Sequence, residues 1–169
     1  MSRQKHLPAL DGLRAVAVFI VIAYHADITK GIPADLGVTL FFVLSGFLIT
    51  WLLLREFDES GTISIRRFYV RRTLRIFPAY YVFAVISFAL DTVLGKRWTI
   101  GLITVTFTYL VNYYNALFGH PTTSVAHAWS LAVEEQFYLL WPLVCLALLK
   151  RSRATATTAV ACMVLLVAA

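Results

Sequence analysis

Two ionisable residues stand out in the first apolar segment, about 10–28: Arg14 and His25. They lie eleven residues apart, which is about three turns of α-helix, so one face would carry both, roughly 16 Å apart along the axis. There a histidine can act as a general base and an arginine can bind an anion. Taken singly, Arg14 also fits a helix-end cation and His25 a satisfied core or interfacial histidine. Their common face favours the functional interpretation.

A second group of candidates is a set of arginines in the segment 64–77. On a helical wheel, four of them share one arc of about 140°, opposite an apolar face. The four are Arg67, Arg71, Arg72 and Arg75. A guanidinium group binds phosphate oxygens bidentately, through two parallel hydrogen bonds. These arginines could therefore clamp the phosphates of a cytoplasmic nucleotide-containing donor. An interfacial helix attracted to anionic lipid would show the same spacing, and the pattern alone leaves both interpretations open.

Two adjacent acids, Glu134 and Glu135, begin an otherwise apolar helix after His127. The positive end of the helix dipole favours carboxylates at this position, which is a sufficient structural explanation. A carboxylate beside a histidine can also orient the ring, fix its tautomer and raise its basicity. If this helix begins on the same side of a membrane as His25, the acids are candidates for that role.

The elements that must position these residues are membrane helices, because the composition is far from that of a soluble domain. Of 169 residues, 60% are hydrophobic and only 14% are charged. Uncharged blocks cover 36–54, 98–119 and 154–169, close to the roughly 18 residues of a membrane-spanning helix. The net charge of +6 is concentrated at segment ends, which favours membrane orientation over nucleic acid binding. Cys145 and Cys162 lie in apolar runs and indicate neither a disulfide nor a metal site.

The blocks resolve into apolar segments that we expect to be helical. They cover about 10–28, 37–54, 64–77, 79–94, 100–118 and 131–149, and a last one begins near Thr155 and stops in mid-helix at the chain end. Pro78 is expected to end or kink the helix before it. The expected fold class is all-α, a polytopic transmembrane helix bundle with about five to six apolar helices in this part of the chain.

Basic residues set the expected orientation, since loops rich in Lys and Arg stay in the cytoplasm. The N-terminus and the connection after the second span are both basic. The basic cluster 150–153 is cytoplasmic only if one of the segments 79–94 and 100–118 does not cross. We expect 100–118 to be re-entrant or kinked, which places Ser124 outside and Ser152 in the cytoplasm.

Four motifs, in this order, resemble the acyltransferase 3 family of bacterial membrane proteins. The first joins Leu10-Asp-Gly-Leu-Arg14 to His25, and the second is Leu40-Phe-Phe-Val-Leu-Ser-Gly-Phe-Leu-Ile49. The third is Arg71-Arg-Thr-Leu-Arg-Ile-Phe-Pro-Ala-Tyr-Tyr81, and the fourth is Trp129-Ser-Leu-Ala-Val-Glu-Glu-Gln-Phe-Tyr-Leu-Leu-Trp-Pro142. The resemblance covers nearly the whole chain, and the four motifs together make it specific.

The resemblance implies an inner-membrane O-acyltransferase of about ten spans, which moves an acyl group from acyl-CoA to a carbohydrate hydroxyl. Residues 1–169 would be the N-terminal part of a single transmembrane acyltransferase domain, with the N-terminus in the cytoplasm. We expect acetyl as the acyl group, a carbohydrate or glycolipid of the cell envelope as acceptor, and no bound cofactor or metal. The essential arginine and histidine of the family's first helix match Arg14 and His25. Its paired arginines match Arg72 and Arg75, and its acid matches Glu134.

The expected mechanism places acyl-CoA phosphates on Arg14, Arg72 and Arg75. His25, supported by Glu134, would be the general base on the acceptor hydroxyl, which attacks the thioester carbonyl. An acyl-histidine intermediate is a variant of this scheme. Two other classes remain open: a polar-solute transporter or exporter with an intramembrane Arg/His/Glu relay, and a purely structural membrane component. The structural alternative leaves Arg14 and His25 unexplained.

Overall fold

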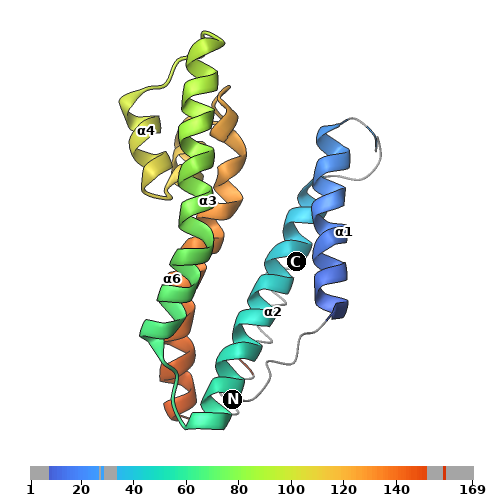
Figure 1. The fold of residues 1–169 in the computed structure, drawn as a ribbon, viewed down its shortest axis with the longest axis vertical. Helices are drawn as coiled ribbons and strands as arrows, with labels where there is room; N and C mark the ends of the chain where they lie inside the picture. Colours follow the sequence, from blue (N-terminus) through green and yellow to red (C-terminus); the bar gives the residue numbers. More distant parts are fainter. Residues whose placement is uncertain (1–7, 27, 29–33, 152–157, 159–169) are drawn as a thin grey trace. The chain divides into compact units, whose positions relative to one another are not determined.

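The computed structural model describes residues 8–26, 28, 34–151 and 158, and this part of the chain is helical without any strand. The elements are α1 (Pro8–His25), α2 (Ala34–Ser60), α3 (Ile65–Val93), α4 (Ile100–Phe107), α5 (Val111–Phe118), the 3-10 helix η1 (Ser124–Ala128) and α6 (Trp129–Arg151) (Figure 1). The expected all-α class is confirmed. The helix expected from Thr155 onward lies outside the described residues, apart from residue 158.

Among the described residues, three helices are long and apolar enough to cross a membrane. They are residues 35–60 of α2, the whole of α3, and the stretch 124–151 formed by η1 and α6. Several such helices in a short chain define a multi-pass membrane protein. The helix α1, at 18 residues, is not among these three.

Of the two outcomes expected at Pro78, an end or a kink of the helix, the first does not occur. The segments 64–77 and 79–94 form one helix, α3, with Pro78 inside it. Proline removes one backbone hydrogen bond, whereas ending a helix leaves up to four N–H and four C=O groups unpaired. In apolar surroundings no water satisfies those groups, so continuing through the proline costs less than stopping.

The segment 100–118 is broken into two helices of eight residues each, α4 and α5. Each is about 12 Å long, far short of the roughly 30 Å of bilayer hydrocarbon. The break falls at Tyr109, whose backbone has a φ of 56°. This arrangement agrees with the expectation that the segment does not cross as one continuous helix.

The chain divides into two compact units. One contains α1 and α2 with the end of α6, and the other covers Ile63–Val144. In the first unit α1 packs on α2 at Gly37, where a Cβ atom would lie only 2.8 Å from both the Ala17 carbonyl oxygen and Val21 Cγ2. This close approach requires a glycine.

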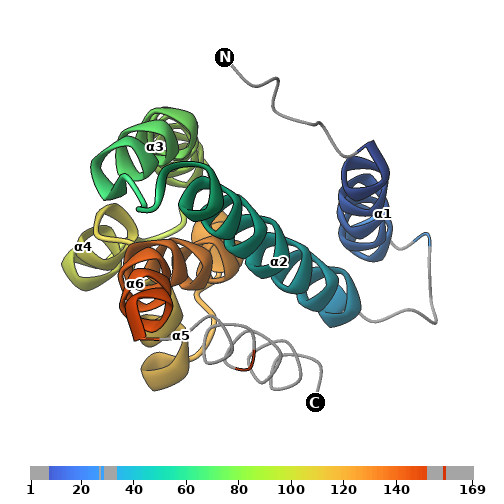
Figure 2. The same ribbon diagram turned by 90° about the horizontal axis from the view of Figure 1, so that it is seen from below.

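The second unit holds most of the candidate residues. Helices α4 and α5 lie beside α3 and α6 (Figure 2). The buried core is one cluster of aliphatic and aromatic side chains: Tyr80, Leu102, Tyr109, Val125, Ala128 and Ala132. Small residues at the start of α6 allow the tyrosines of α3 and of the break to pack closely against it.

One side chain ties the end of α3 to the start of η1. Asp91 is fully buried and accepts hydrogen bonds from the Ser124 backbone N–H (2.8 Å), the Ser124 hydroxyl (2.7 Å) and Trp98 Nε1 (3.1 Å). Lys96 Nζ lies 3.2 Å from Asp91 Oδ1, the oxygen that also accepts from the Ser124 hydroxyl. The carboxylate is thus neutralised and fully engaged, and it fixes where η1 and α6 begin.

Orientation can be tested at two exposed threonines, Thr62 between α2 and α3 and Thr122 before η1. Ser124 is unsuitable because it bonds to Asp91. Single cysteines at 62 and 122, in a background lacking Cys145 and Cys162, are treated in intact cells with a membrane-impermeant thiol reagent. The basic connection between α2 and α3 is expected in the cytoplasm. Thr122→Cys should therefore be labelled in intact cells, and Thr62→Cys only after permeabilisation. Labelling at 62 alone would reverse the orientation. Labelling at both would show that the two positions share a side, so either α3 does not cross or the segment 100–118 crosses as well.

Candidate functional site

The predicted residues Arg14 and His25 both belong to α1, with His25 at its C-terminal end. Arg14 is partly buried, and its guanidinium carbon lies 6.0 Å from the centre of the Phe41 ring on α2. A cation over an aromatic face is stabilised by the ring quadrupole, so α2 holds Arg14 in place. The side chain of His25 lies outside what the structure describes.

Arg72 of α3 lies against α6 within the second unit. Its guanidinium carbon lies 4.1 Å from the centre of the Tyr138 ring on α6 and 6.0 Å from that of Phe68. The charge also interacts electrostatically with the carboxylates of Glu134 and Glu135. A guanidinium stacked on an aromatic ring and balanced by two acids is firmly held between α3 and α6.

Glu134 is buried, with 7% of its surface exposed, and it accepts a hydrogen bond from the Tyr138 hydroxyl one turn further along α6. Arg72, Glu134 and Tyr138 therefore form one cluster, which the structure brings together from two helices. Tyr138 was not predicted as a site residue. Its spacing of four residues from Glu134, with both on one helix face, was the signal that could have found it.

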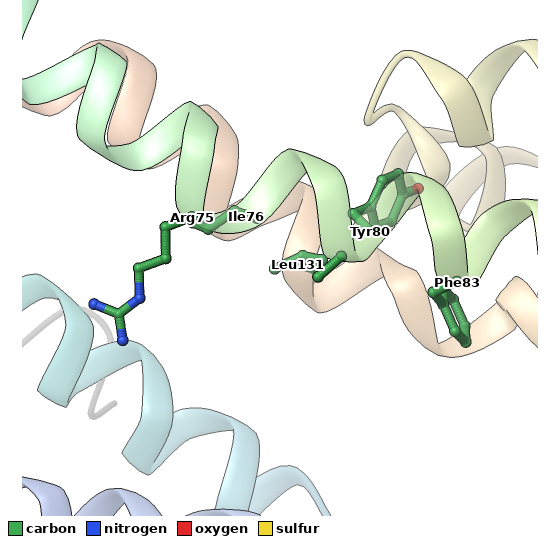
Figure 3. Close-up of a pocket in the computed structure, with 6 residues that line it drawn as sticks. Arg75, Ile76, Tyr80, Phe83 and Leu131 are labelled. Atoms are coloured by element: carbon green, nitrogen blue, oxygen red, sulfur yellow. The ribbon is translucent and has the colours of Figure 1, made fainter.

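Arg75, which with Arg72 matches the family's paired arginines, has a different environment. Its side chain is exposed and lines a pocket of about 370 Å³. The remaining lining is apolar or aromatic and comes from α3 and α6: Ile76, Ala79, Tyr80, Phe83 and Leu131 (Figure 3). A cation beside an apolar wall suits a ligand with an anionic group and an apolar or extended chain.

The break between α4 and α5 is surrounded by polar side chains that satisfy its backbone. The hydroxyls of Tyr80 and Tyr81 donate to the carbonyls of Thr106 (2.7 Å) and Phe107 (3.3 Å), at the end of α4. Gln136 Nε2 donates to the Tyr109 carbonyl at 2.9 Å.

The amide of Gln136 also pairs with an amide on α5. Gln136 Nε2 donates to Asn112 Oδ1 at 3.0 Å, and Asn112 Nδ2 donates to Gln136 Oε1 at 3.2 Å. This reciprocal pair links α5 to α6. Because Gln136 also holds the Tyr109 carbonyl, one side chain of α6 fixes both sides of the break.

Tyr109 itself is held by aromatic stacking. Its ring lies 4.1 Å from that of Tyr80 and 5.1 Å from that of Phe77, both nearly parallel to it. Tyr109 lies outside the three candidate spans. Burial, followed by the charge of Glu135, raises the pKa of its hydroxyl well above the usual range, so this group stays protonated at neutral pH.

No group of His, Cys, Asp and Glu able to hold a metal ion occurs within residues 8–151 as far as they are described. His127 is exposed in η1. Ionisable groups gathered inside a multi-pass helical protein are typical of a membrane enzyme or transporter.

Comparison with known proteins decides between these classes. Residues 7–169 match the model of a family described as an acyltransferase domain, and the chain belongs to this family. The resemblance to acyltransferase 3 proteins is thereby confirmed.

The chain is also similar to three bacterial proteins, each 37% identical to it. The peptidoglycan O-acetyltransferase OatA of Listeria monocytogenes aligns over 158 residues, which is 87% of this chain and 25% of the relative. A Staphylococcus aureus (strain COL) protein with the provisional name O-acetyltransferase aligns over 160 residues, 88% of this chain and 26% of its own length. The Bacillus subtilis protein YrhL, provisionally named a peptidoglycan O-acetyltransferase, aligns over 154 residues, which is 84% of this chain and 24% of its own length. The chain thus spans about a quarter of these relatives, and no solved structure matches it.

Arg72 and Arg75 should respond differently to substitution by lysine. In the full-length protein, Arg72→Lys loses the planar stack on Tyr138 and should lower the free energy of unfolding by about 1 kcal/mol. Arg75→Lys, at an exposed position, should change it by less than about 0.5 kcal/mol. Thermal unfolding in detergent measures both variants. Equal destabilisation, or none at Arg72, would contradict the stacked position.

Proposed function

We propose that the full-length protein is an O-acyltransferase of the inner membrane, which moves an acetyl group from acyl-CoA to a hydroxyl of a cell-envelope glycan. The observation that carries the proposal is the 37% identity, over 87% of this chain, to a peptidoglycan O-acetyltransferase of Listeria monocytogenes. The membership of the acyltransferase family supports the same reaction class.

The donor side of the proposed site is Arg75 with its pocket. Acyl-CoA carries phosphates and an extended chain that ends in the thioester, and a cation beside an apolar wall complements both parts. Arg14 is the second proposed phosphate ligand. Arg72 already lies over the Tyr138 ring and interacts electrostatically with Glu134 and Glu135, so we assign it to holding Glu134 in place.

The chemical step requires a base for the acceptor hydroxyl, and we assign this role to His25. The histidine takes the hydroxyl proton while the oxygen attacks the thioester carbonyl. The carbon–sulfur bond then breaks, and the CoA thiolate leaves and takes up a proton, which regenerates neutral His25. Glu134 is the carboxylate proposed to support His25, and its hydrogen bond from Tyr138 fixes the direction of its oxygens.

The expected orientation supports this division of roles. The basic residues at 66–75 begin α3 on the side proposed to be cytoplasmic, where acyl-CoA is available. His25 closes α1 at the end remote from the basic N-terminus, towards the envelope glycan.

Replacement of His25 by Ala tests the catalytic assignment. In membrane vesicles that contain the full-length protein, labelled acetyl-CoA and an envelope glycan, His25→Ala should lower the transfer rate by about 10²- to 10⁴-fold. Protein abundance should stay near that of the wild type. His120→Ala, at an exposed histidine before η1, is the matched control and should keep the wild-type rate. Near-normal turnover by His25→Ala would exclude it as the base.

A further inference from the structure

Four buried side-chain atoms make no hydrogen bond to any residue that the structure describes. They are Tyr109 Oη, Asn115 Oδ1, Thr123 Oγ1 and Glu135 Oε1. Buried polar groups almost always have partners, so each such atom needs an explanation. Asn115 already makes two contacts through its amide nitrogen, and Thr123 is a neutral hydroxyl outside the regular helices. Tyr109 and Glu135 differ because they lie on one side of the unit. Tyr109 belongs to the same core cluster as Ala132, and Glu135 follows Ala132 by three residues on the same face of α6.

Tyr109 is an unusual residue in every other respect. Among the described residues it is the only one other than glycine with a positive φ, and only 7% of its surface is exposed. Two stacked rings fix its side chain, and Gln136 fixes its backbone. Backbone strain of this kind persists where the surroundings hold it, and it is concentrated at functional sites. The hydroxyl is thus precisely positioned but unused within the described fold.

Glu135 approaches from another element, α6, and lies next to Glu134. Its carboxylate interacts with Arg72 as well as with Tyr109. A protonated phenol donates a hydrogen bond, and a carboxylate accepts one. Together they match the two needs of a single alcohol hydroxyl, which accepts through its oxygen and donates its proton.

We propose that Tyr109 and Glu135 form the subsite that binds the acceptor hydroxyl. This inference rests on the proposed function and names its acceptor-binding residues. In the absence of acceptor, water offers the same hydroxyl chemistry. A site with a donor and an acceptor poised in this way favours a ligand with a hydroxyl group over an apolar one, because an apolar occupant leaves both groups unpaired.

The test uses full-length protein with Tyr109→Phe and Glu135→Gln. Each variant should raise KM for the glycan acceptor about threefold to tenfold, in line with the loss of one hydrogen bond, and leave KM for acetyl-CoA unchanged. Tyr109→Phe keeps the stacking on Tyr80 and Phe77, so its thermal stability should equal or exceed that of the wild type. Tyr113→Phe, at an exposed tyrosine on α5, is the matched control and should behave as wild type.

Two results would overturn the subsite. The first is an unchanged acceptor KM with lower stability in Tyr109→Phe, which identifies a structural water as the occupant. If the wild type transfers no acetyl group, the proposed function fails, and the subsite is judged by binding of the N-acetylglucosamine–N-acetylmuramic acid disaccharide. Weaker binding by Tyr109→Phe than by the wild type would then support it. Equal binding by both, or no binding by the wild type, is the second overturning result.

Discussion

A helix that stops in apolar surroundings leaves carbonyl oxygens unpaired, and α4 ends in this way at Phe107. The backbone N–H groups of residues 108–110 pair with three of these carbonyls, and other helices supply further donors. Tyr80 and Tyr81 of α3 donate to the last turn of α4, and Gln136 of α6 donates to Tyr109. Irregular backbone at membrane depth is tolerated only where protein or a wet cavity surrounds it. This requirement fixes the positions of α3, α4, α5 and the start of α6 relative to one another.

The ionisable groups lie on the same stretch of α6 as Gln136. Glu134 is buried in this unit, and one side-chain oxygen of Glu135 is buried there as well. Their charge needs compensation, and Arg72 of α3 supplies it while stacking on Tyr138. Buried charge without a partner would be strongly unfavourable, so these residues depend on one another. The polar interior that we connect with acyl transfer is thus inseparable from the way α4 and α5 are held.

The sequence predicts the parts of this structure that depend on local pattern. Apolar blocks locate the helices, and the motifs around Arg14, Arg72 and Glu134 identify the family. The local rule at Pro78 allows either an end or a kink of the helix, and the choice to continue depends on the cost of unpaired backbone in apolar surroundings. Equally, one helical arc contains both Arg72 and Arg75, and only the packing of α6 on α3 separates a stacked arginine from one that lines a pocket. That the Tyr109 hydroxyl has no hydrogen-bond partner among the described residues follows from tertiary contacts alone.

The central claim, acetylation of an envelope glycan, is tested most directly by the content of base-labile acetyl esters in purified cell-wall glycan. Cells that lack the gene for the full-length protein are compared with the same cells carrying a wild-type copy. The account predicts that ester content falls on deletion and returns with the copy, while the amount of glycan stays constant. An ester content that is the same in both strains would contradict it.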